Sequence, residues 1–134
     1  MAYHFGKTSL KRMEGLDSDL IKILNLAIKE TKQDFSVIEG LRTAERQYEL
    51  YQEGQSELDG YERKSMHQFG KAVDIAPYKD GKLVWGIDED PKAWLEVGRA
   101  MLRAARKLNI CLEWGLTYNI GNGYDAPHFQ LNEK

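Results

Sequence analysis

The sequence has little of what several protein classes require. Cys111 is the only cysteine among 134 residues, so no disulfide can form within the chain. Between Ile110 and Leu112 we expect it to be a small apolar filler of a buried strand. No stretch approaches the roughly 20 apolar residues of a membrane-spanning helix, so we expect no membrane insertion. The N-terminus has no apolar run of the kind that marks a conventional signal peptide.

The sequence also lacks a large excess of positive or negative charge. The 19 basic and 21 acidic side chains leave a formal net charge of -2. A protein that binds phosphate backbones normally shows clustered Lys and Arg on a basic domain. We therefore expect no nucleic-acid partner.

The length and the 42% hydrophobic content suit one domain over residues 1–134. Hydrophobic periodicity and capping residues predict helices that begin at Asp17–Ser18, Thr43 and Asp90–Pro91. Asp80–Gly81 predicts a hairpin turn. Predicted strands are Phe35–Arg42, 71–76, Ile110–Trp114 and His128–Leu131, with loops at 55–64 and 115–124. The pattern predicts an α+β fold, a small antiparallel sheet with helices packed on it.

His67, Asp74 and His128 form a candidate metal site. Asp74 interrupts the apolar stretch Ala72–Ala76, where a carboxylate is costly to bury without a partner or a metal. Two imidazoles and one carboxylate suit zinc, and three protein ligands leave one position for water. The simpler alternative is that these are polar side chains with ordinary hydrogen bonds. Asp125, three residues before His128, is a candidate base for the water.

The motif Ser-x-His-x-x-Gly-x-Ala-x-Asp at residues 65–74, followed by Asp-x-x-His at 125–128, resembles that of the zinc D-Ala-D-Ala peptidases. This group includes D,D-peptidases of vancomycin resistance and L-alanyl-D-glutamate peptidase endolysins of phages. The small size is most similar to the phage endolysins, which degrade bacterial peptidoglycan in host lysis. The resemblance implies the zinc-peptidase fold and one Zn²⁺ per chain, held by His67, Asp74 and His128.

The same resemblance implies further roles. Asp125 occupies the position of the catalytic acid or base, and Arg42 that of an arginine near the reacting carbonyl. Arg42 would stabilise the oxyanion or bind a substrate carboxylate, and the alternative for it is a surface ion pair. Ser65 would contact substrate or serve as a cap. Lys64 and Lys71 are further candidates for binding the carboxylates of the stem peptide.

One segment departs from the resemblance. Many relatives have Trp-Gly-Gly-Asp-Trp before the last motif, where this chain has Trp-Gly-Leu-Thr-Tyr at 114–118. Trp114 and Tyr118 are candidates for lining a substrate cleft, or they pack beneath the loop. The departure puts the identity of the cleaved bond in doubt.

We expect a zinc metallopeptidase, an endolysin that cleaves the L-alanyl-D-glutamate bond of the peptidoglycan stem peptide. Alternatives are a D,D-carboxypeptidase or D,D-dipeptidase with the same zinc site, and a non-catalytic zinc-binding module. We expect a monomer that is made in the host cytoplasm and acts in the periplasm or cell wall. Because no signal peptide is present, a separate holin-type protein would release it through the membrane.

Overall fold

The computed structural model describes residues 2–115, 119–120, 123–124 and 126–132. Its helices are α1 (Lys7–Arg12), α2 (Ser18–Glu30), α3 (Ala44–Gln52), the short 3-10 helix η1 (Met66–Phe69) and α4 (Pro91–Lys107). Its strands are β1 (Phe35–Glu39), β2 (Ala72–Lys79), β3 (Lys82–Leu83), β4 (Leu112–Trp114), β5 (Asn119–Ile120), β6 (Gly123–Tyr124) and β7 (His128–Leu131). An antiparallel sheet in the order β1-β2-β7-β4, with β3 paired to β2, confirms the α+β class.

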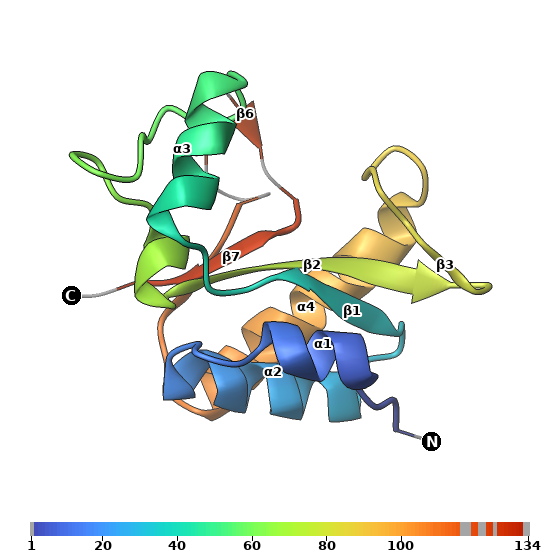
Figure 1. The fold of residues 1–134 in the computed structure, drawn as a ribbon. Coiled ribbons are helices and arrows are strands. Elements are labelled where there is room, and N and C mark those ends of the chain that lie inside the picture. Colours follow the sequence, from blue (N-terminus) through green and yellow to red (C-terminus); the bar gives the residue numbers. More distant parts are fainter. Residues whose placement is uncertain (1, 116–118, 121–122, 125, 133–134) are drawn as a thin grey trace.

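The helices lie on two sides of this sheet. In Figure 1, α1 and α2 lie below the sheet and α3 lies above it, next to the end of the sheet where η1 leads into β2. The apolar face of α2 packs against α4, and both contribute to one core with β1, β2, β4 and β7. Fully buried members of this core include Leu20, Leu24, Val37, Ile75 and Met101. Among the described residues, no helix is long and apolar enough to cross a membrane.

Alternation along two neighbouring strands separates this core from a polar face of the sheet. In β2, Val73 and Ile75 belong to the core and Asp74 points the other way. In β7, Phe129 belongs to the core and His128 points the other way. The antiparallel register pairs Asp74 directly with His128, so the two side chains are cross-strand neighbours.

The predicted helix starts are confirmed by their caps. Asp17 Oδ1 accepts from the backbone nitrogen of Asp19, and Thr43 Oγ1 accepts from that of Arg46. Asp90 caps α4 through the backbone nitrogen of Ala93. The hairpin at residues 80–81 is also confirmed, since it connects β2 to β3.

Other predictions differ from the structure. Helix α1 was not predicted, because it is short and Ser9 is its one buried residue. The predicted loop at 115–124 contains the paired strands β5 and β6. Strand β1 ends at Glu39 rather than Arg42, whose backbone nitrogen bonds to His67 instead. Cys111 is exposed rather than buried, because its neighbours Ile110 and Leu112 pack against the core and the residue between them points away from it.

Candidate metal centre

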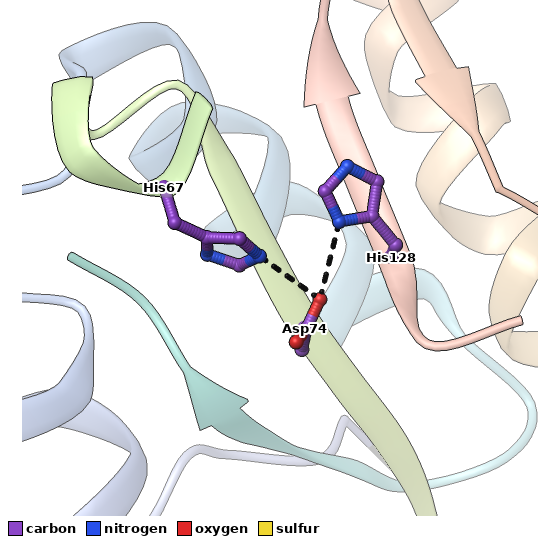
Figure 2. A group of neighbouring side chains, drawn as sticks. All are labelled: His67, Asp74 and His128. Atoms are coloured by element: carbon purple, nitrogen blue, oxygen red, sulfur yellow. Dashed lines mark ion pairs between the residues drawn. The ribbon is translucent and has the colours of Figure 1, made fainter. Parts of the chain in front are cut away.

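Three side chains predicted as metal ligands converge at one point on the polar face of the sheet. His67 Nε2 lies 3.2 Å and His128 Nδ1 lies 3.4 Å from the same oxygen, Oδ1 of Asp74 (Figure 2). The donor atoms of all three residues lie within 4.8 Å of one another. His67 and His128 are buried, so little of either imidazole is exposed to solvent. This geometry supports the predicted cluster at these three positions.

The three residues come from different elements. Asp74 and His128 face each other across β2 and β7, and His67 lies on η1. The start of η1 is held by Gln68, whose Oε1 accepts from the backbone nitrogen of Ser65. Gly70 then ends η1 in the left-handed conformation, with φ of 69°, and the chain turns into β2. His67 and Asp74 therefore approach each other although they belong to separate elements.

Hydrogen bonds fix which nitrogen of each ring carries a proton. His67 Nδ1 lies 2.9 Å from the carbonyl oxygen of Gly40, which can only accept, so Nδ1 is the donor. His128 Nε2 lies 2.7 Å from Gln130 Oε1, and the amide nitrogen of Gln130 points to Glu113 at 3.4 Å. His67 Nε2 and His128 Nδ1 are thus left with lone pairs directed at Asp74, as metal-binding imidazoles require.

Asp74 is a carboxylate at neutral pH. Burial by itself raises the pKa of Asp74, whereas protonation of either neighbouring imidazole, at His128 or His67, would supply a hydrogen bond and a positive charge that lower it. Its Oδ1 is buried and has no hydrogen-bond partner among the described residues. Two ring nitrogens and an anionic oxygen that converge in this way fit a bound cation.

Arg42 lies beside this cluster with a fixed guanidinium. Its Nε and Nη2 donate to the two carboxylate oxygens of Glu39 at 2.8 and 2.9 Å. Its Nη2 also lies 3.8 Å from Asp74 Oδ2, and its side chain is only 10% exposed. The ion pair that was the alternative for Arg42 exists, yet it is largely buried and next to the candidate ligands.

Gln47 is the third partner of Arg42 and was not predicted from the sequence. Its Oε1 accepts from Arg42 Nη1 at 2.8 Å. Its amide nitrogen donates to Ser56 Oγ and to the Leu58 carbonyl, each at 2.8 Å. No signal for this role is visible in the polar sequence of α3, because the full burial of Gln47 is seen only in the structure.

A cleft of about 600 Å³ opens over the candidate metal site. It lies between the polar face of β2 and β7 and the wall made by α3 and the segment that follows it. The described residues that line it are Glu39, Arg42, Arg46, Leu50, Gly54, Gln55, Ser56, Glu57, Leu58, Ser65, Met66, His67, Asp74, His128 and Gln130. The site therefore has room for an extended ligand such as a peptide.

The remaining predicted site residues lie in different places. Ser65 lines the cleft, and its buried Oγ makes no hydrogen bond to another described residue. Trp114 is 3% exposed, stacks on Phe129 at 5.5 Å and donates from Nε1 to the Ala126 carbonyl. This position fits the packing role of Trp114 and corrects its assignment to the cleft wall. Tyr118 and Asp125 lie outside the described residues.

The cationic residues near the cleft also differ from expectation. Lys71 Nζ binds Asp17 Oδ2 at 3.0 Å, and neither Lys64 nor Lys71 is among the described residues that line the cleft. Arg46 does line it, and was not predicted. Its spacing places it on the same helical face of α3 as Leu50, but that this face borders the cleft is seen only in the structure.

Comparison with known proteins agrees with this geometry. The family model described as phage L-alanyl-D-glutamate peptidase matches residues 1–131. The L-alanyl-D-glutamate peptidase of Escherichia phage T5 is 32% identical over 124 residues, which cover 92% of this chain and 88% of that protein. The peptidoglycan L-alanyl-D-glutamate endopeptidase CwlK of Bacillus subtilis is 31% identical over 109 residues, covering 73% of this chain and 60% of CwlK.

Solved structures share the fold. The L-Ala D-Glu endopeptidase ChiX of Serratia marcescens has a TM-score of 0.82 and 32% identity, with 96% of this chain and 90% of that chain covered. The vancomycin resistance D,D-dipeptidase VanXYg has a TM-score of 0.55 and 16% identity over 87% of this chain and 50% of its own, a likeness of fold alone. With the family model matching nearly the whole chain, the protein belongs to the phage L-alanyl-D-glutamate peptidase family.

Proposed function

We propose that this peptidase holds one Zn²⁺ with His67, Asp74 and His128 and hydrolyses the L-alanyl-D-glutamate bond of peptidoglycan stem peptides. The convergence of the three donor atoms carries the proposal. Zinc bonds of about 2.0–2.1 Å in tetrahedral geometry separate two ligand atoms by about 3.3–3.4 Å. The distances from Asp74 Oδ1 to the two ring nitrogens are 3.2 and 3.4 Å. The spacing and the two-imidazole, one-carboxylate chemistry both suit zinc.

The reaction is hydrolysis of an amide. Bound zinc would polarise the scissile carbonyl and make a water acidic enough to attack near neutral pH. We assign Asp125 as the base that takes a proton from the attacking water and returns it to the departing amine. The carbon–nitrogen bond breaks, so alanine gains a carboxylate and glutamate gains a free amine. Asp125 has this role through its sequence position, three residues before His128.

Arg42 and Ser65 complete the proposed site. The Arg42 guanidinium is held beside Asp74 by Glu39 and Gln47, so it needs little reorganisation to face negative charge on the scissile oxygen. This fixed position favours oxyanion stabilisation over binding of a substrate carboxylate. Ser65 lines the cleft two residues before His67, and we assign it a contact with a peptide group of the substrate.

Fragment analysis of purified sacculi tests the proposal. The zinc-loaded protein is incubated with sacculi, and the released fragments are sequenced by mass spectrometry beside a chelated sample. New amino-terminal glutamate on the stem peptides, seen only with metal, is the expected result. Loss of terminal D-alanine instead would identify a D,D-carboxypeptidase. Absence of fragments in both samples would support a D,D-dipeptidase or a non-catalytic zinc module. The monomeric state and release by a separate holin-type protein stay predictions.

A further inference from the structure

The cleft contains two cationic side chains among its described lining residues, Arg42 and Arg46. The segment 116–125, which is described only in part, contains neither Lys nor Arg, so it adds no cationic side chain. Within the described lining of the cleft, these two arginines are the side chains that can pair with a substrate carboxylate.

The two arginines differ in what already occupies them. Arg42 has its Nε, Nη1 and Nη2 engaged by Glu39 and Gln47, and it is largely buried. The side chain of Arg46 is 49% exposed. Among the described residues its one ion-pair partner is Glu49, with Nη1 3.2 Å from Oε2, and that carboxylate is itself exposed. Exposed ion pairs of this kind contribute little to stability because solvent screens them, so a ligand can replace Glu49 at little cost.

The substrate chemistry supplies such a ligand. Glutamate has two carboxyl groups besides the amine that forms the scissile amide with alanine. A stem peptide continues through one of them, so the other stays a free carboxylate within a few covalent bonds of the scissile nitrogen. A planar guanidinium binds a carboxylate through two parallel hydrogen bonds, which gives direction as well as attraction.

We infer that Arg46 binds the free carboxylate of the glutamate residue and thereby selects L-alanyl-D-glutamate over uncharged stem peptides. The inference rests on the proposed function. The acidic lining residues agree with a carboxylate placed at Arg46: Glu39 is neutralised by Arg42, and Asp74 belongs to the metal donors. Glu57 is the exposed acid of the described lining, and the bound carboxylate must lie away from it.

Two muropeptides test the inference: one keeps the free glutamate carboxylate, and its twin has a carboxamide there. The wild type should cleave the carboxylate form with about 10- to 100-fold higher kcat/KM, carried mostly by KM, because a charge-assisted contact is lost in the twin. Arg46→Gln should cleave both forms with similar kcat/KM, because the contact that distinguishes them is lost. Arg46→Lys should keep part of the preference, since lysine keeps the positive charge but cannot form the two parallel hydrogen bonds of a guanidinium. The N-cap of α3 should be unaffected by either substitution, because its hydrogen bond to Thr43 Oγ1 comes from the backbone nitrogen of Arg46.

Arg99→Gln is the matched control, since Arg99 is an exposed arginine on α4 that does not line the cleft. Glu49→Gln is a second control, which frees Arg46 and should leave the preference intact. A preference that persists in Arg46→Gln, or a wild type without preference, would overturn the inference. A wild type that cleaves neither muropeptide would instead remove the proposed function itself, and that result is visible without any variant.

Discussion

Arg42 and Gln47 are joined by a 2.8 Å hydrogen bond from Nη1 to Oε1. Because the Gln47 amide nitrogen also donates to Ser56 and Leu58, one fully buried side chain ties the cation beside the metal donors to the opposite wall of the cleft. The position of the guanidinium and the shape of the cleft are therefore coupled.

Gln47→Ala should lower both the stability of the protein and its catalytic rate. Unpaired groups around the lost amide should lower the free energy of unfolding by about 1–3 kcal/mol. A misplaced guanidinium should lower kcat by roughly 10- to 100-fold, with zinc content unchanged. Urea unfolding, metal analysis and kinetics on muropeptides check this. Gln52→Ala, an exposed glutamine on the same helix, is the control. Normal kcat in Gln47→Ala would show that Arg42 does not depend on Gln47.

Removal of a metal ligand should affect zinc content and stability together. His67→Ala should lose zinc, and its melting temperature should no longer respond to a chelator. In the wild type, free zinc at a hundred times Kd contributes about 2.7 kcal/mol, or roughly 10 °C in melting temperature. His4→Ala changes an exposed histidine outside the cluster and should behave as the wild type. Full zinc content in His67→Ala would remove His67 from the site.

Asp125→Asn should separate chemistry from metal binding. The amide cannot accept the proton, so hydrolysis should fall by about a hundred- to ten-thousand-fold, while zinc stays bound. Turnover of muropeptides and zinc content in the same preparation measure both effects. Loss of zinc together with activity would make Asp125 a ligand or a structural residue rather than a base.

Gly40→Ala should disturb the metal centre from a distance. A Cβ at Gly40 would collide with the Arg12 carbonyl, and the Gly40 carbonyl holds His67 Nδ1. We expect a loss of about 1–3 kcal/mol in stability and a roughly 10- to 100-fold weaker zinc affinity. Gly86→Ala, where an added Cβ meets open space, is the control. Thermal unfolding and competition with a zinc-binding dye are the measurements.

Asp17 should make stability depend on pH. The backbone hydrogen bond from Asp19 and the hydrogen bond from Lys71 lower the Asp17 pKa below its ordinary 3.8. The unfolded chain therefore binds this proton first as pH falls, so the contribution of Asp17 is present above pH 3.8 and is lost below it. Asp17→Asn, which keeps a capping oxygen, should be less stable than the wild type at pH 7. Urea unfolding of both proteins from pH 7 down should show the difference shrinking, and a constant difference would contradict the prediction.

The local sequence was sufficient for the elements that depend on nearby residues. Caps at Asp17, Thr43 and Asp90 begin helices through hydrogen bonds that span two or three residues. The donor types of the metal cluster were also predictable, because a carboxylate within an apolar strand needs a partner. Helix α1 was missed because it buries too little to show a periodic pattern.

The tertiary structure decided how the site is arranged. The register of β2 against β7 places Asp74 opposite His128, and the Gly40 carbonyl, 27 residues away in the chain, selects the lone pair of His67. The tertiary structure also buries Trp114 in the core. It places Arg46 at the cleft with only an exposed ion pair to Glu49. Sequence spacing carries no information on these contacts, since each depends on segments that meet only after the sheet has formed. The sequence by itself determined which chemistry the chain contains, and the packing of distant segments decided where each group points.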